Sequence, residues 1–306
     1  MDRGAPLPPS PGLSLQPLLE PPPDPGCGTL TVARVAGASA LVRARGTAPL
    51  HLLTPRCRGA SVWVYAATFG GGLVGGDRIE LDVDVGPGAA ALVATQSSTK
   101  VYRTAGPPAS QHLRARIAEG ALLALLPDPI SCFAGAAYRQ RISLEIAPGG
   151  SLVALDGLVS GRAARRERWA FASYGSVLEI RECEGERGGD ADRRLLRDAL
   201  WLEDTPGSTV AERFGRFEAI ASAVVIGPAV ASIAASVLAS ASAPLRPQGP
   251  RRGPRASLLA TAAPLPGGGA LLRVAGESVE QVAAAVRGAL GGLAALLGDD
   301  PWARRP

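Results

Sequence analysis

Hydroxyl side chains and the only lysine of the chain, Lys100, are concentrated in one segment, which runs from Thr95 to Arg103. In a hydrolase, a serine or threonine of such a segment would act as the nucleophile and Lys100 as its base. The spacing argues against this chemistry, because no Ser-x-x-Lys motif joins Ser98 to Lys100 and neither histidine lies in a triad signature. We therefore expect no hydrolase activity from this segment.

A glycine-rich segment lies just before this hydroxyl-rich one. Residues 70–75 read Gly-Gly-Gly-Leu-Val-Gly and match the GxGxxG pattern of dinucleotide-binding loops. That fold needs a helix after the loop and an acid about twenty residues further on. Here a strand pattern follows, and position 95 is threonine. No Lys-Ser or Lys-Thr follows either, so the segment is not a phosphate-binding loop, and it indicates a backbone that turns sharply or lies close against a partner.

Metal-binding residue types are sparse and scattered. The four cysteines form no CxxC pair, and the chain has two histidines; these residues are Cys27, Cys57, Cys132, Cys183, His51 and His112. A zinc site needs closely spaced ligand pairs, and a disulfide-held fold needs far more cysteine per residue. We therefore expect no tightly bound cofactor, and any metal to be held weakly by carboxylates or a lone thiolate.

Strand patterns recur along the chain and must position these residues. Residues 79–85 alternate apolar and acidic side chains, turn at Gly86-Pro87-Gly88 and continue as a second apolar strand from Ala89. The same strand–turn–strand sequence returns around Gly120 and Gly149, about every thirty residues, and a weaker copy spans residues 35–42. Such hairpins cannot bury their apolar faces alone, so we expect them to stack. The alternative is an ordinary β-sandwich whose turns recur at similar intervals.

The fold class predicted from this pattern is mainly β, with stacked β-hairpins forming a β-sandwich or β-helix-like body and a few helices. If the units stack, Gln96, Asp128 and Asp156 follow equivalent second strands and should form one row along an edge of the sheet. One helix near the C-terminus is expected from Ser278 to about Leu297, and a capping box at Thr209 predicts another.

The flanking and linking segments have distinct compositions. Residues 1–26 are rich in proline and predict a disordered tail without a secretory signal, and a mobile Arg/Pro-rich loop is expected near 241–257. The apolar run 219–243 is broken by Gly227-Pro228, which favours a buried strand, a turn and an Ala-rich helix over a membrane span. We expect a cytoplasmic protein with no membrane partner.

The net charge of +5 could indicate an anionic partner such as nucleic acid. Nearly all of the positive charge is arginine, however, as a GC-rich coding bias would produce, and no recognised nucleic-acid-binding module accompanies it. We expect no nucleic-acid binding.

Four motifs in order resemble the urease accessory protein D family, which is also called H. The segment Gly71–Asp77 is similar to its GG-V-GGD loop, and residues 95–103 to its T-x-x-x-TK-YR strand. Residues 126–133 read Leu-Pro-Asp-Pro-Ile-Ser-Cys-Phe and resemble its LPDPVTCF type. Ser160-Gly161-Arg162 with Glu167-Arg168-Trp169 resembles its SGR…GE-W segment, although Arg166 stands where the family usually has glycine. The likeness extends from about Thr29 to Arg304.

The resemblance implies a single domain over residues 27–306 that is mainly β and catalyses nothing. Family members dock on apo-urease and on accessory protein F, which recruits the GTPase accessory protein G. They assist nickel delivery to the urease active site, and nickel is thought to pass through a water-filled internal path and to be handled only transiently.

On this interpretation, polar residues at strand ends form the nickel path or a partner surface. The candidates are Gly75, Gly76, Asp77, Thr95, Ser98, Thr99, Lys100, Tyr102, Arg103, Asp128, Asp156, Arg162 and Glu167. Weak transit ligands are expected at Asp77, Asp128, Asp156 and Glu167, although an aspartate in such sequences can also be an ordinary turn residue. Lys100 and Arg103 could instead secure the loop or a partner carboxylate. The rival hypothesis is a β scaffold that binds an acidic protein partner and has no metal role.

The scattered ligands lead to a first prediction. We expect the purified protein alone to bind Ni²⁺ no more tightly than micromolar, because oxygen ligands without clustered histidine and cysteine hold this cation weakly. Isothermal titration calorimetry measures this affinity. A one-to-one site of nanomolar affinity would contradict the prediction.

Overall fold

The computed structural model describes residues 24–56, 59–162, 165–183, 193–240 and 256–303. Most of the predicted Pro-rich tail and of the predicted Arg/Pro-rich loop lies outside these residues. Residues 24–26 form a turn that leads into the first strand.

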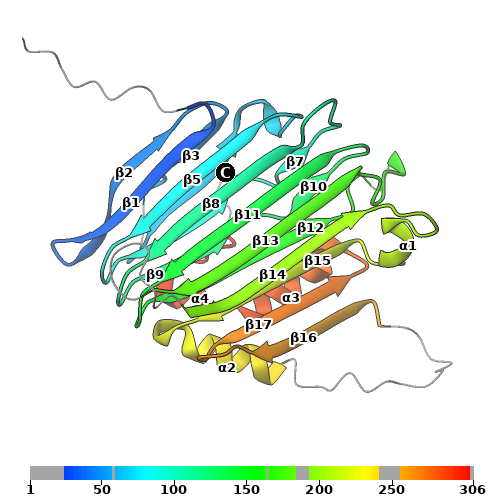
Figure 1. The fold of residues 1–306 in the computed structure, drawn as a ribbon. Helices are drawn as coiled ribbons and strands as arrows, with labels where there is room; N and C mark the ends of the chain where they lie inside the picture. The colour runs from blue at the N-terminus through cyan, green and yellow to red at the C-terminus, as the bar shows by residue number, and fades with distance from the viewer. Residues whose placement is uncertain (1–23, 57–58, 163–164, 184–192, 241–255, 304–306) are drawn as a thin grey trace, which may run out of the picture.

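Two β-sheets face each other and enclose the core (Figure 1). Sheet 1 has the strand order β14 (Arg193–Glu203), β13 (Ser173–Glu182), β11 (Ala137–Ile146), β8 (Ala109–Ile117), β5 (Arg78–Val85), β1 (Cys27–Val35) and β2 (Ala38–Gly46). Sheet 2 has the order β16 (Leu258–Pro264), β17 (Ala270–Gly276), β15 (Ala219–Ile226), β12 (Ser151–Val159), β9 (Leu122–Leu126), β6 (Ala90–Thr95), β4 (Val62–Thr68) and β3 (Leu50–Leu53). Two short strands, β10 (Ile130–Cys132) and β7 (Lys100–Val101), extend sheet 2 beside β12.

The strand–turn–strand units stack as the sequence predicts, and the mainly β class is confirmed. One detail differs, because the two strands of a unit do not pair with each other as a hairpin. The first strands β5, β8 and β11 pair in parallel within sheet 1, and the second strands β6, β9 and β12 pair in parallel within sheet 2. Each unit is therefore an arch between the sheets. The weaker copy is a true hairpin, since β1 and β2 are antiparallel neighbours.

The turns of the arches stack on one another as well. Gly88, Gly120 and Gly149 have φ values of 64°, 66° and 79°, a left-handed conformation that favours glycine. The Gly88 N–H donates to Glu119 O at 3.0 Å, and the Gly120 N–H donates to Gly149 O at 3.2 Å. Hydrogen bonds between units therefore continue through the turns, which explains the regular recurrence of these glycines.

The helices that pack on a sheet face in the described part of the chain lie on the outer side of sheet 2. Helices α2 (Ala231–Ser240), α3 (Val279–Ala289) and α4 (Leu293–Leu297) pack on sheet 2 and enclose a second apolar cluster there. The short helix α1 (Val210–Phe214) begins with the predicted capping box at Thr209. Figure 1 shows no helix lying across the outer face of sheet 1.

The predicted elements near the C-terminus are largely present. Residues 219–240 of the apolar run form strand β15, a turn at Gly227 and helix α2, as expected. The predicted C-terminal helix is present as α3 and α4, which are separated at Leu290–Gly292. None of the described helices is long and apolar enough to cross a membrane.

Candidate functional site

A row of polar side chains lies inside the sandwich, where the strand alternation would otherwise place apolar residues. Gln111 of β8, Gln140 of β11 and Ser176 of β13 are register neighbours, so their side chains share the inner face of sheet 1. Asp156 of β12 bonds to this row from the opposite sheet. Polar side chains are thus aligned across the space between the sheets.

Hydrogen bonds join these residues into a continuous chain. The Tyr138 hydroxyl donates to the Gln111 side-chain carbonyl and lies 3.2 Å from that of Gln140. The Gln140 amide donates to Asp156 Oδ1 at 3.0 Å, and the Ser176 hydroxyl donates to Asp156 Oδ2 at 2.8 Å. Both carboxylate oxygens of the half-buried Asp156 therefore accept a hydrogen bond, which offsets their loss of contact with water.

Two cavities lie at the ends of this chain. The first has a volume of about 170 Å³, and its lining includes Gln111, Gln140 and the strand end from Thr95 to Thr99. The second has a volume of about 50 Å³, and its polar lining comprises Asp156, Tyr174, Ser176, Asp198 and Ser222. The bond from Gln140 to Asp156 connects them. The sandwich therefore contains a polar path, defined by Gln111, Tyr138, Gln140, Asp156 and Ser176.

Asp156 is the acid of this path. Burial raises the pKa of its carboxyl, and the hydrogen bonds from Ser176 and Gln140 partly oppose that rise. The nearby Asp198 also favours the neutral form, although it is itself paired with Arg273 at 3.0 Å. Asp156 is half-buried, and no positively charged side chain is among the groups that set its pKa.

The glycine loop and the hydroxyl-rich segment meet at one end of the sandwich. Leu73 pairs with Val101, and the Leu73 N–H donates to Lys100 O at 2.8 Å. A Cβ at Gly72 would lie 2.6 Å from Lys100 O and 2.7 Å from the Tyr102 ring. The close approach that the glycines predict is therefore to the chain itself.

The predicted residues of the segment 95–103 divide into two groups. Thr95, Ser98 and Thr99 line the first cavity. Lys100, Tyr102 and Arg103 are not among its lining residues: Lys100 is exposed, and Tyr102 stacks edge-on against Phe133 with a centroid distance of 5.4 Å. Arg103 lies against Gly135, whose Cβ would be 3.4 Å from its side chain.

Arg162 and Glu167 form a two-pronged ion pair beside that aromatic contact. Arg162 Nε and Nη2 donate to the two Glu167 oxygens at 2.8 and 2.7 Å, and the guanidinium lies 4.2 Å from the Phe133 ring centroid. Arg162, together with the Ala134 N–H, lowers the pKa of Glu167. The Glu167 carboxylate is therefore held by Arg162 and by the protein backbone.

Asp77 and Asp128 have local partners. The Asp77 carboxylate accepts from the Val74 N–H at 2.8 Å within the glycine turn, in which Gly76 has a φ of 88° and the Gly75 Cβ position touches Thr104. Thr95 Oγ1 accepts from the Asp128 N–H at 2.8 Å and lies 3.3 Å from its carboxylate. Roles in a metal path remain predictions for both acids.

The predicted edge row is wrong for Asp156, whereas the pairing of Ala94 with Leu126 makes Gln96 and Asp128 level with each other just past their strands. The register pairs Ala154 with Leu125, which makes Asp156 level with Pro127 rather than with Asp128. A one-residue offset turns a side chain to the opposite face of a sheet. Strand β12 also continues past the ends of β6 and β9 because it pairs with β15, so Asp156 is an interior strand residue opposite Ser222.

Sequence reasoning missed four residues of the path, Gln111, Tyr138, Gln140 and Ser176, and also Asp198 in the lining of the second cavity. A signal was present, since Gln111 and Gln140 interrupt the inward positions of strands that are otherwise apolar on that face. Among the described residues, no group of three or more His, Cys, Asp or Glu side chains could hold a metal ion.

Arg166 adopts a backbone conformation that is unfavourable for a side-chain-bearing residue. Its φ is 58°, and the buried Trp169 of the same loop has a φ of 54°. The left-handed region costs L-residues roughly 1–2 kcal/mol, whereas glycine adopts it freely. Arg166 therefore occupies a glycine-type position in the turn that carries Glu167.

Replacing Arg166 should relieve this strain. We expect Arg166→Gly to stabilise the protein by about 1 kcal/mol, an increase that thermal unfolding can measure. The matched control is Arg165→Gly, which removes the same charge from the adjacent residue. An equal or larger stabilisation in the control would show that charge rather than backbone strain is responsible.

The raised pKa of Asp156 predicts how the stability of the fold depends on pH. Because the folded state raises its pKa, ionisation of Asp156 destabilises the fold progressively as pH rises from the ordinary aspartate value through the folded value. Asp156→Asn removes this penalty, so we expect a variant at least as stable as the wild type at pH 7, with the difference shrinking toward pH 4. Asp156→Ala should instead be destabilised by about 1–3 kcal/mol, because Gln140 and Ser176 lose their acceptor. Denaturant unfolding at several pH values measures both differences.

Comparison with known proteins gives the chain a family. The family model described as UreD urease accessory protein matches residues 25–306. A urease accessory protein UreD of Sorangium cellulosum (strain So ce56) is 49% identical over 281 residues, covering 92% of this chain and 84% of that protein. One from Anaeromyxobacter sp. (strain Fw109-5) is 46% identical and covers 92% of this chain and 90% of that protein. A urease accessory protein D of Oryza sativa subsp. japonica is 32% identical, with coverages of 90% and 94%. The chain therefore belongs to the UreD urease accessory protein family.

Proposed function

We propose that the protein is a non-catalytic urease maturation factor that docks apo-urease and accessory proteins F and G and passes nickel to the urease active site. The observation that carries the nickel step is the polar path, a hydrogen-bonded chain between two cavities inside an otherwise apolar sandwich. Family membership supports the accessory role. Docking and delivery take place in the cytoplasm, without a nucleic-acid or membrane partner.

The chemistry of the path suits a cargo that must be released. Amide, hydroxyl and carboxylate oxygens are hard ligands, and Ni²⁺ prefers the nitrogen or sulfur ligands of a tight site. Asp156 supplies attraction at the centre, while Thr95, Ser98 and Thr99 offer hydroxyl oxygens in the first cavity. Asp77, Asp128 and Glu167 are further weak ligands on this proposal. The cation is thereby drawn inward without being retained.

The second candidate function is a β scaffold that binds an acidic protein partner and has no metal role. It is favoured by Arg139 and Arg141, which lie on the outer face of sheet 1, and Figure 1 shows no helix covering that face. On that reading the interior polar chain only fixes the packing of the two sheets. The two candidate functions predict different results when the charge of Asp156 is removed without changing the size of the side chain. Only the nickel-delivery function predicts that less nickel reaches urease.

We expect Asp156→Asn to lower urease activation several-fold while leaving the complex intact. Asparagine keeps the volume of the side chain: its carbonyl can accept from Gln140, and its amide can donate to the Ser176 hydroxyl, which can also accept. The substitution removes the charge that attracts the cation. The measurement is urease activity and bound nickel after co-expression with all accessory proteins, together with a pull-down of protein F. Asp84→Asn is the matched control, since Asp84 is an exposed acid on the outer face of the same sandwich.

The outcomes separate the two candidates. Reduced activity and nickel with an intact complex support the path. Normal activity in Asp156→Asn favours the scaffold without a metal role. Loss of both activity and F binding would indicate that Asp156 acts through the fold or an interface.

A further inference from the structure

A trough crosses the outer face of sheet 1, at right angles to its strands. Five adjacent strands, β5, β8, β11, β13 and β14, contribute to it, and its volume is about 400 Å³. Register pairing aligns the outward side chains in two rows, and backbone forms the floor between them. The first row consists of Arg78, Ser110, Arg139, Gly175 and Trp201. The second row consists of Glu80, His112, Arg141, Val177 and Ala199.

An aromatic platform forms one end of the trough. Trp201 is 55% exposed and lies over Gly175, where a Cβ would be only 2.8 Å from the indole. The Arg139 guanidinium stacks on the same ring at 3.9 Å from its centroid. The indole is therefore held flat against the sheet and open to solvent. Fixed tryptophan and arginine side chains of this kind dominate the binding energy of protein interfaces.

Two guanidinium groups in the middle of the trough form no ion pair with a carboxylate of the described residues, and Glu203 acts on Arg139 only as a nearby charge. Among the described residues, the hydrogen bonds of Arg139 are to the Tyr138 carbonyl at 2.8 Å and the Ser173 hydroxyl at 3.2 Å. Arg141 is exposed and makes no ion pair within the described part of the chain. Both positive charges are therefore available to an acidic ligand.

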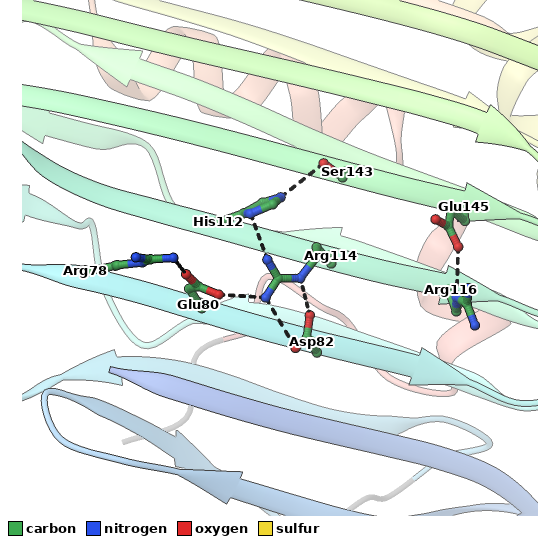
Figure 2. A network of polar contacts seen from close by, with 8 residues as sticks. All are labelled: Arg78, Glu80, Asp82, His112, Arg114, Arg116, Ser143 and Glu145. Atoms are coloured by element: carbon green, nitrogen blue, oxygen red, sulfur yellow. Dashed lines mark hydrogen bonds and ion pairs between the residues drawn. The ribbon is translucent and has the colours of Figure 1, made fainter. Parts of the chain in front are cut away.

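The far end of the trough has its charges balanced internally (Figure 2). Glu80 pairs with Arg78 and with Arg114, the latter at 2.7 Å, and Arg114 also binds Asp82. Arg114 donates to His112 Nδ1 at 2.9 Å, which requires a neutral imidazole, and burial together with Arg114 lowers the pKa of His112. This end adds no free positive charge, and Glu80 would repel a phosphate backbone.

We propose that the trough docks an extended acidic segment of a protein partner, with an aromatic or proline side chain on Trp201 and carboxylates opposite Arg139 and Arg141. Five strands at about 4.8 Å spacing span roughly 19 Å, which matches about six extended residues at ~3.3 Å each. Charge complementarity selects the acidic segment, and Val177 and Ala199 beside Trp201 suit an apolar contact. Only the partner's identity, one of the urease maturation proteins, rests on the proposed function.

The test uses two sets of twelve-residue peptides on the full-length protein. The first set is designed, with glutamates beside a tyrosine or proline, and has glutamine-substituted counterparts. The second tiles the urease subunits and accessory proteins F and G encoded in the same genome. Binding is measured by fluorescence polarisation. We expect acidic peptides that carry an aromatic or proline residue to bind, and their glutamine counterparts to bind on the order of tenfold more weakly.

Variants assign the binding to the trough. Arg141→Glu should weaken binding at least tenfold and Trp201→Ala by a similar factor, whereas Arg197→Glu should leave it unchanged. Arg197 is an exposed arginine on the same face outside the trough, so it controls for net charge. If Arg141→Glu fails to fold, Arg139→Gln is the second trough variant, since it removes the charge but keeps a planar polar group beside Trp201.

Each outcome has a fixed meaning. No binding of either set, equal binding by Arg141→Glu and wild type, or preference for a single-stranded RNA oligonucleotide overturns the proposal. Binding of the designed set without any natural peptide supports the acidic-segment trough but removes the assigned partners. Urease activation without any peptide binding overturns the trough alone and leaves the proposed function intact.

Discussion

Parallel pairing between successive arches sets the register of the side chains in the central strands of both sheets. Each unit lies directly beside its predecessor in both sheets, so equivalent positions of different units become neighbours about 4.8 Å apart. A polar residue at one inward position therefore becomes part of a row when the next units repeat it. Gln111, Gln140 and Ser176 form such a row inside, and Arg139 and Arg141 belong to such rows outside. Stacked registers thus convert scattered sequence positions into continuous sites.

The interior row is not explained by stability alone. Polar groups buried between sheets must all be hydrogen-bonded, and removing one partner costs about 1–3 kcal/mol. Replacing a whole buried polar set by apolar residues of similar volume is often neutral or stabilising. The surrounding interior is built from aliphatic residues such as Ile79, Leu81 and Val93, so an apolar row would pack there without difficulty. Packing alone therefore does not require an acid at Asp156, which supports the role proposed for it in the polar path.

Sequence reasoning predicted what depends on local chemistry. The alternation of apolar and polar residues predicted the strands. The recurring turn glycines predicted the stacked units, because left-handed turns favour glycine. It could not distinguish an arch from a hairpin, since both use the same strand–turn–strand pattern and differ only in long-range pairing. Asp156 was misplaced for the same reason. The direction of its side chain depends on a one-residue difference in register and on the pairing of β12 with β15. The glycine-type conformation of Arg166 was detectable only by comparison with the family pattern.

The polar path and the trough occupy the two faces of the same three strands. In β8, β11 and β13, side chains that point inward belong to the path, and those that point outward belong to the trough, one residue apart. Gln140 lies directly between Arg139 and Arg141, so its backbone forms the trough floor while its amide binds Asp156. An occupied trough would hold the backbone of β11, and hence the position of the Gln140 side chain, more rigidly. Strand alternation nevertheless keeps the two sets of side chains separate, so substitutions at outward positions alter docking without changing the chemistry of the path.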